Sequence, residues 1–519
     1  AWWDDIWLNE SFASWIEDKV LVGFDKTWPT QVNEHRVKAF RADELLSARK
    51  IRQPITSEAD IHNVFDAITY PKGAIVLRML EHQLGETAFQ TAVQHYLAAH
   101  ADGNATGADL FAALDEAAGK PLGALTTAWF DQGGVPEVAM DLTCDGRGTS
   151  KVTLTQKRFL PNSTQPSDQR WSIPVCVAFE GPNNGRLEQC TVLTTETAEL
   201  DLPVCPTWFA PAGDYGYFHS KLDAQALEAV RDHAWDKLTR DERIAIYGDA
   251  AIYARNGQPT MELLWSLTRK LAHDRDDREL IVALGDLSTS GGTLGLPGEL
   301  ARAIPIELLP AARTKLRAEY EKLVKTSGIV PHGDEGVTQT LLRDDLIDLA
   351  SWSRSHVLDA EAKKLFAHYR ELPTEQLSAV IEIAANADPK LAAQLRTDLD
   401  AEHDPVIHST IIDVLSNLRV EHRAMLESII ADPKVSSEDI AGLWSSADEE
   451  VRAENEAFLR AHLDEVVKRL PSAATADAPL ILALTVPFTL ACEAATRDEI
   501  VAYLKEHFGS IPTIARPLQ

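Results

Sequence analysis

Two residues near the start of the sequence have side chains suited to hydrolytic chemistry. Glu10 lies in the run WLNESF, at the beginning of an apolar, tryptophan-rich helical stretch. Its carboxylate is either a first-turn acid favoured by the helix dipole or a metal ligand in an aromatic setting. Tyr70 lies just ahead of a second helical stretch, where a tyrosine usually packs its ring and forms an ordinary hydrogen bond. Neither residue alone indicates an enzyme.

The residues around Glu10 and Tyr70 form a longer pattern. Residues 1–15 read AWWDDIWLNESFASW, and residues 65–80 read FDAITYPKGAIVLRML. Together these runs resemble the active-site segment of the aminopeptidase N family of gluzincin metallopeptidases. The resemblance is specific over the first 136 residues, weaker through the strand-rich region that follows, and general in the remainder. Further matching positions are Gly85–Phe89, Trp129–Gly133, Gln156–Phe159, Trp171–Pro174 and Gly216–Phe218.

The resemblance implies a role for each of these residues. It makes Glu10 the third protein ligand of a catalytic zinc, and Tyr70 the hydroxyl that donates to the oxyanion of the tetrahedral intermediate. Both roles suit the residue types, because a catalytic zinc takes three protein ligands and a neutral phenol stabilises developing negative charge. Asn9 and Asp66 are positions from which a side chain could orient the metal ligands, although a purely structural role is the commoner one there.

The histidines that would complete such a zinc site are absent from the sequence. None of the sixteen histidines belongs to an H-E-x-x-H motif, which supplies two zinc ligands and the general base in this family. The family's Gly-Ala-Met-Glu-Asn segment, whose Glu holds the free amino group of the substrate, is also absent. We therefore expect the sequence to be the carboxy-terminal part of a longer enzyme. Alone it should neither hold zinc stably nor cleave substrates.

These observations leave three functions to weigh. The first is a zinc aminopeptidase that removes residues from peptides with a free amino terminus, in the parent protein. The second is a non-catalytic scaffold or peptide-binding module built on the same fold, which would have no need of Glu10 or Tyr70. The third, a related gluzincin with epoxide hydrolase activity, is disfavoured by the long tail after the strands.

Periodicity predicts the elements that must position these residues. Apolar residues recur at intervals of three and four along residues 9–129, for example Phe12, Trp15, Ile16 and Val20, which predicts helices. The period becomes two in residues 137–218, with frequent Gly, Pro and Asn turns, which predicts a small β-sandwich. Residues beyond 221 again form amphipathic helices. Their start signals are a capping box at Thr239–Glu242 and the pairs Asp388-Pro389, Asp404-Pro405 and Asp432-Pro433.

The predicted fold is therefore multidomain and mainly α. Residues 1–136 should form the helical C-lobe of a thermolysin-like catalytic domain, and residues 137–220 the β-sandwich. Residues 221–519 should form a helical domain of the α-solenoid type, like HEAT or armadillo repeats, without a strict repeat.

Four of the five cysteines fall in the predicted sandwich. A hairpin with strands at 171–180 and 186–193 places Cys176 directly opposite Cys190. The two thiols either form a disulfide, which would indicate an oxidising compartment, or are small buried hydrophobic residues. Both interpretations remain open, and export to the periplasm or the extracellular space is favoured over a cytoplasmic location.

Composition excludes two classes of partner. The formal net charge is -29, and no run of Lys or Arg offers contacts to phosphate, so we expect no nucleic-acid binding. The longest apolar stretch, residues 479–492, is interrupted by polar residues and proline and is shorter than the roughly 20 residues that span a bilayer. We therefore expect no membrane span. The oligomeric state is not indicated.

Overall fold

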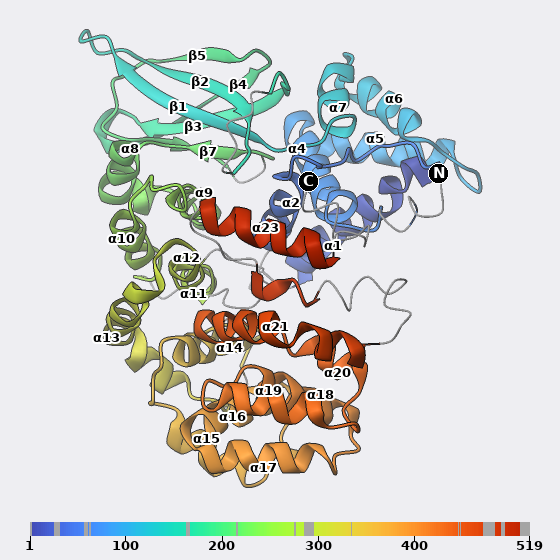
Figure 1. Cartoon of the computed structure of the whole chain (residues 1–519). Coiled ribbons are helices and arrows are strands. Elements are labelled where there is room, and N and C mark those ends of the chain that lie inside the picture. The colour runs from blue at the N-terminus through green and yellow to red at the C-terminus, as the bar shows by residue number, and fades with distance from the viewer. Residues whose placement is uncertain are drawn as a thin grey trace. The chain divides into compact units, whose positions relative to one another are not determined.

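The structure is a computed structural model of the 519-residue chain. It divides into two compact units, one of residues 1–283 with 291–296 and one of residues 284–290 with 297–519 (Figure 1). The predicted boundaries at 136 and 220 are not tested by this division, so they stay a prediction. The described residues are 3–24, 32–56, 61, 64–161, 167–213, 216–273, 277–284, 295–333, 335–444, 446, 448–470, 483–488 and 494–508.

The first unit begins with a helical lobe. Its helices are α1 (Trp7–Phe24), α2 (Val32–Asp43), α4 (Gly73–Leu84), α5 (Glu86–Ala99), α6 (Gly107–Ala118) and α7 (Gly123–Phe130), preceded by the short helix η1 (Trp3–Asp5). A π-helical turn, η2 (Ile68–Lys72), leads directly into α4. Aromatic rings fill the core of the lobe, where Trp7 stacks on Phe111 and packs against Phe130.

Helix α1 buries a different face from the one that its apolar residues predict. Ile16 and Val20 are each 46% exposed, whereas Ser11 and Ser14 are buried. The expectation of a single apolar face at residues 12, 15, 16 and 20 is therefore wrong in part. At Ser11 the reason is steric, because the start of α4 at Gly73 approaches α1 so closely that only a small side chain fits there.

The strands follow the helical lobe and form two sheets (Figure 1). One sheet has the order β5-β2-β1-β7 and the other the order β4-β3-β6. All neighbouring strands are antiparallel except β1 and β7. The strands are β1 (Pro136–Cys144), β2 (Ser150–Arg158), β3 (Ile173–Glu180), β4 (Arg186–Leu193), β5 (Thr197–Leu202), β6 (Phe209–Pro211) and β7 (His219–Lys221).

The buried side chain of Gln156 joins the two sheets. Its Nε2 donates to the carbonyl oxygens of Trp171 at 3.0 Å and Thr195 at 2.9 Å, and its Oε1 accepts from the Trp171 amide at 2.9 Å. A buried amide is stable only when both ends are hydrogen-bonded, and here both are. This glutamine was noted in the sequence only as a matching position.

Two disulfides cross-link the sandwich. Cys176 on β3 lies directly opposite Cys190 on β4, in the register that the hairpin predicts, and the two are bonded. A second disulfide joins Cys144 at the end of β1 to Cys205, 61 positions later. The sequence did not predict this second pair, because the two residues meet only when β1, β2 and β5 are assembled into one sheet.

Helices make up the rest of both units, as the sequence predicts. In the first unit they are α8 (Ala224–Ala229), η4 (Val230–Ala234), η5 (Trp235–Lys237), α9 (Arg240–Ala254), α10 (Met261–Leu271) and α11 (Asp277–Leu284). The second unit contains α12 (Leu296–Ala303), η6 (Ile306–Leu308), α13 (Leu309–Ser327), α14 (Val337–Trp352), α15 (Asp359–Phe366), α16 (Thr374–Ala387), α17 (Pro389–Leu399), α18 (Pro405–Ser416), α19 (His422–Ala431), α20 (Ser437–Gly442), α21 (Glu449–Arg469) and α23 (Ala494–Phe508). Consecutive helices such as α13 and α14, or α15 and α16, pack on each other. The predicted fold class, mainly α with small sheets, is confirmed.

The helix start signals are correct with one exception. Thr239 forms the capping box of α9, and Asp388 and Asp404 cap α17 and α18. Asp432 starts no helix: its carboxylate accepts from the Lys434 amide as a capping aspartate does and pairs with Arg396, but only a turn follows. The next helix begins four residues later, where Ser436 and Asp439 form another capping box.

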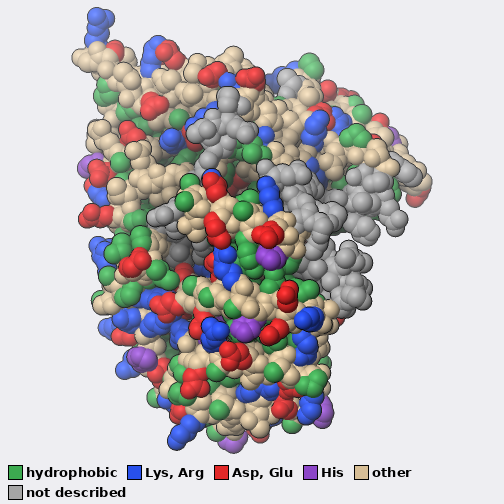
Figure 2. Space-filling view, viewed as in Figure 1, with side chains coloured by type: hydrophobic (Ala, Val, Ile, Leu, Met, Phe, Trp, Pro, Cys, Tyr) green, Lys and Arg blue, Asp and Glu red, His purple; other side chains and the backbone are tan. Residues whose placement is uncertain are grey.

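On the face shown in Figure 2, acidic and basic side chains are interspersed. No helix among the described residues is long and apolar enough to cross a membrane. The apolar stretch at residues 479–492 lies largely outside the described residues.

A buried charge cluster connects the helical lobe, the sandwich and α9. The imidazole of His219 lies between Glu44, 3.1 Å from Nε2, and Asp249, 3.0 Å from Nδ1. Arg36 lies 3.4 Å from Asp249 on its other side, and the Tyr253 ring packs against the imidazole. Burial lowers the pKa of His219, but its hydrogen bonds to Asp249 and Glu44 outweigh that effect, so the pKa is raised.

This cluster predicts a pH-dependent contribution to stability. A raised pKa in the folded state means that the protonated ring stabilises the fold fully below its ordinary pKa of about 6.5 and loses this contribution as the pH rises through the raised value. His219→Gln should therefore lower the free energy of unfolding by about 3 kcal/mol at about pH 6, and by less at about pH 9. Chemical denaturation at both pH values measures the difference. His95→Gln, at an exposed position of α5, is the control. A loss that is equal at both pH values would contradict the assignment.

Candidate active site

The structure brings Glu10 and Tyr70 together from separate helical elements. The Glu10 carboxylate lies close enough to the Tyr70 hydroxyl to contribute to the raised pKa of that group. Glu10 lies in the first turn of α1, and Tyr70 in the middle of η2. Both side chains are partly exposed, so they are accessible to a small ligand.

A close contact next to these two residues holds the pair in place. The Ser11 hydroxyl donates to the Thr69 carbonyl oxygen at 2.7 Å, in a buried position. Gly73 makes this approach possible, because a Cβ at that position would lie 1.9 Å from the Ser11 oxygen. Since Ser11 follows Glu10 and Thr69 precedes Tyr70, the contact aligns the carboxylate with the phenol.

The π-helical turn sets the direction of Tyr70. Its Lys72 amide bonds back to the Ala67 carbonyl at 3.0 Å, and Pro71 within the turn has no amide hydrogen to donate. The turn therefore departs from α-helical spacing just where Tyr70 lies. Single π turns are rare and occur often at functional sites.

Asp66 holds this turn from its start. Its Oδ1 accepts from the amides of Ile68 at 2.9 Å and Thr69 at 3.2 Å, and its Oδ2 accepts from Arg49 at 2.9 Å. These bonds place Asp66 against the backbone that carries Tyr70. Asn9 is exposed in the first turn of α1. For both residues, an effect on metal ligands stays a prediction.

A fully buried ion pair lies beneath the turn. Lys72 Nζ is 2.7 Å from Asp43 Oδ2, and neither side chain is exposed. Asp43 also accepts from the Tyr217 hydroxyl at 3.0 Å and from the Gly134 amide at 2.7 Å. Burial lowers the pKa of Lys72, against the opposing effect of Asp43. Nothing in the spacing of these residues marks them as partners, so sequence reasoning missed them.

The electrostatics of the pair keep Tyr70 as a hydrogen-bond donor and leave the Glu10 carboxylate able to bind a cation. Burial, together with the Glu10 carboxylate, raises the pKa of Tyr70, so its hydroxyl is protonated at neutral pH. Within the described part of the chain, Glu10 forms no ion pair with Lys or Arg. One carboxylate oxygen of Glu10 can therefore bind a cation, although a single ligand does not hold one against water.

Comparison with known proteins covers both ends of the chain. The peptidase family M1 domain matches residues 1–129, and the ERAP1-like C-terminal domain matches residues 209–519. Tricorn protease-interacting factor F2 of Thermoplasma acidophilum is 26% identical over 408 residues, which are 77% of this chain and 49% of that protein. Aminopeptidase 2, mitochondrial, of Saccharomyces cerevisiae is 25% identical over 503 residues, which are 91% of this chain and 49% of that protein. Aminopeptidase M1 of Arabidopsis thaliana is 36% identical over 192 residues, 36% of this chain and 21% of that protein. The chain spans about half or less of the length of these relatives.

The contact between Tyr70 and Glu10 can be tested on this chain directly. Glu10→Gln removes the charge that disfavours the phenolate, so the pKa of Tyr70 should fall toward its ordinary value of about 10. The difference in ultraviolet absorption between each protein and its Tyr70→Phe counterpart isolates this titration. Glu17→Gln, at an exposed position of α1, should leave the pKa of Tyr70 unchanged.

A backbone variant tests the alignment of the pair. Gly73→Ala adds a methyl group where Ser11 already lies and should lower the pKa of Tyr70 by moving it away from Glu10. Gly248→Ala, which adds a methyl group with no atom within 4 Å, is its control. If the pKa of Tyr70 stayed as high in both Glu10→Gln and Gly73→Ala as in the parent chain, the two groups would not be in contact.

Proposed function

Because this chain belongs to the aminopeptidase N family of M1 peptidases, we propose that the whole protein is a zinc-dependent aminopeptidase that releases amino-terminal residues from peptides. The observation that carries the proposal is the pairing of Tyr70 with Glu10 inside a segment that matches the M1 peptidase domain. The names of the relatives support the same reaction, since two of the three described above are aminopeptidases. The relatives are longer than this chain, so the activity belongs to the whole protein.

Glu10 is proposed as one ligand of the catalytic zinc. Carboxylate oxygen is an accepted zinc donor, and this carboxylate is partly exposed and has no basic partner among the described residues. The chain therefore fits the metal at this one position. Two further ligands and a general base are needed, and we propose that an H-E-x-x-H segment outside these 519 residues supplies them. When bound, zinc polarises the scissile carbonyl and activates water.

Tyr70 is proposed as the donor to the developing oxyanion. Its raised pKa keeps the proton on the hydroxyl at neutral pH, so the group can donate without ionising. The contact of Ser11 with Thr69 and the bonds of Asp66 hold the turn that carries it. A fixed donor stabilises charge with little reorganisation, which favours the transition state over the ground state.

A second candidate is a non-catalytic scaffold or peptide-binding module. The absence of H-E-x-x-H from the 519 residues is the observation that favours it. Against it, a binding surface has no use for a tyrosine hydroxyl held near a carboxylate beside a π turn. Zinc content of the whole protein separates the two candidates.

The two disulfides support a location in an oxidising compartment. Disulfides are rare in the reducing cytosol and common in exported proteins. We propose that the protein acts in the periplasm or outside the cell, on peptides that have a free amino terminus.

The role of Tyr70 predicts the kinetics of a variant of the whole protein. Tyr70→Phe keeps the ring and its packing but removes the donor. It should lower kcat roughly 100- to 1,000-fold with little change in KM and with zinc content unchanged. Peptide hydrolysis assays with metal analysis check both values. Tyr96→Phe, in α5, should retain full activity.

Glu10→Ala gives a different expected result and completes the test. Loss of a ligand should lower zinc occupancy itself, whereas Tyr70→Phe should not. If the whole protein binds peptides but neither zinc nor activity can be measured, the scaffold is the correct function. Full kcat in Tyr70→Phe would show that the tyrosine is structural.

The proposed compartment predicts the state of the cysteines. A peptide map of native material without reductant should contain the pairs Cys144–Cys205 and Cys176–Cys190. Closing loops of these lengths should contribute about 4 kcal/mol and about 3 kcal/mol to stability, so reduction should lower the melting temperature. Free thiols at all four positions in material from the native compartment would argue for a reducing location.

A further inference from the structure

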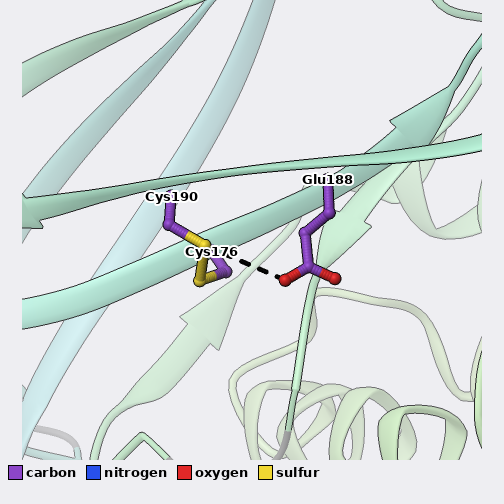
Figure 3. Close-up of side chains that lie close together, drawn as sticks. All are labelled: Cys176, Glu188 and Cys190. Carbon is purple, nitrogen blue, oxygen red and sulfur yellow. Dashed lines mark hydrogen bonds between the residues drawn. A yellow bond between two sulfur atoms is a disulfide. The ribbon is translucent and has the colours of Figure 1, made fainter. Parts of the chain in front are cut away.

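A cluster of possible metal ligands lies on the β3–β4 hairpin, with Cys176 buried and Glu188 and Cys190 exposed, on elements other than those of the candidate active site. Figure 3 shows Cys176, Glu188 and Cys190 with their side chains converging. The two sulfur atoms and a carboxylate oxygen of Glu188 all lie within 4.8 Å of one another, the only such group of three or more among the described residues. Glu188 and Cys190 are two positions apart on β4, so they share a face of the strand.

The distances within this cluster suit a tetrahedral cation once the sulfur atoms are no longer bonded to each other. With metal–sulfur bonds of about 2.3 Å and metal–oxygen bonds of about 2.0 Å, a tetrahedral site separates sulfur from oxygen by roughly 3.5 Å and the two sulfurs by roughly 3.8 Å. Glu188 Oε1 is already 3.8 Å from Cys190 Sγ. The sulfur atoms need only separate by rotation of their side chains.

We propose that the reduced hairpin is a second metal site, in which Cys176, Cys190 and Glu188 bind one thiophilic divalent cation such as zinc or cadmium. Two thiolates and a carboxylate form a donor set that favours these metals over magnesium or calcium. A water molecule completes the four positions. This site is separate from the proposed catalytic zinc and does not depend on the aminopeptidase function.

The disulfide and the metal exclude each other, so in the oxidising compartment proposed above the hairpin holds the disulfide, and the metal form requires a dithiol reductant. A dithiol reductant supplies two electrons and two protons, the sulfur–sulfur bond breaks to give two thiols, and the dithiol is oxidised to its own disulfide. The cation then displaces both thiol protons to solvent. Reoxidation by transfer of the disulfide from an oxidised dithiol releases the metal.

The residues around the cluster allow both the reduction of the disulfide and the binding of the cation. Cys190 and Glu188 are exposed, so a reductant and a cation can reach them. Arg186 binds Glu188 through Oε2 at 3.2 Å, which leaves Oε1 toward the sulfur. Arg186 is itself held by Glu242 at 2.6 Å, so the orientation of the group is set by α9.

The other disulfide provides a matched control. Cys144 and Cys205 are joined in the same sandwich, but no third ligand lies beside them within the described residues. A double variant Cys144→Ser/Cys205→Ser isolates the hairpin pair, and Cys176→Ser/Cys190→Ser isolates the control pair. Cys492 is common to both proteins.

The experiment is a titration with cadmium. Each protein is reduced with dithiothreitol, freed of it by gel filtration without oxygen, checked for folding by circular dichroism, and titrated while the ultraviolet band of cadmium–thiolate bonds is followed. The protein with the hairpin pair should bind one cadmium per chain with the band saturating, and should show no band when oxidised. The control protein should bind at least roughly tenfold more weakly.

Glu188→Gln in the hairpin-pair background keeps both cysteines and changes only an exposed side chain. It should weaken cadmium binding at least roughly tenfold, because an amide oxygen is a poorer ligand than a carboxylate. Equal affinity in the two cysteine backgrounds, or an unchanged affinity in Glu188→Gln, would overturn the proposal. Unfolding of the reduced chain would also overturn it, because the hairpin would then not hold the three ligands together.

Discussion

The hydrogen bond from Ser11 to the carbonyl oxygen of Thr69, in the space left by Gly73, determines much of the helical lobe. It requires a small residue on each helix, and it brings the backbone of α1 close to the π turn. Glu10 and Tyr70 flank this contact, so their separation follows from it. The same contact explains why α1 buries serines and leaves part of its apolar stripe exposed. The proximity of Glu10 and Tyr70 and the burial of Ser11 thus have the same cause.

The end of α2 supports this arrangement through two buried charge clusters. Asp43 binds Lys72 under the π turn, and the next residue, Glu44, binds His219 on β7. Removing charges from water is costly, and replacing such pairs by apolar residues is often neutral or stabilising. These pairs favour one arrangement of the segments, because each carboxylate accepts hydrogen bonds only from groups placed at hydrogen-bond distance. The last residue of α2 and the residue after it therefore connect the turn that carries Tyr70 and the sandwich within the first unit.

Local patterns in the sequence predicted features whose causes are local. The hairpin register that places Cys176 opposite Cys190 follows from turn and strand lengths, and the capping box at Thr239 follows from two residues three positions apart. Features that depend on distant segments were missed or wrong. Cys144 and Cys205 meet through the order of three strands, and no periodicity could indicate that Lys72 is fully buried. Asp432 and proline resemble a helix start, and the carboxylate even accepts from the amide two positions on, yet only a turn follows before Ser436.

The candidate site shows the same limit. Glu10 and Tyr70 were chosen by resemblance, and the sequence alone offered no reason for the two to meet. Their proximity depends on Gly73 and Ser11, two small residues whose types indicate no chemistry. For Asp66 an effect on metal ligands stays a prediction, while the bonds that it forms to the backbone of the turn were not predicted.

The two disulfides are nested, since Cys176 and Cys190 both lie between Cys144 and Cys205 in the chain. Strands β2 to β5 are therefore enclosed in one covalent loop. If a protease cuts one peptide bond anywhere inside that loop, the two pieces remain attached through Cys144 and Cys205. A chain cut once in this loop would then remain one covalent molecule until a reductant breaks the disulfide. The protein is proposed to work outside the cytosol, where other peptidases can cut it. One cut within the sandwich would leave both pieces joined by the disulfide.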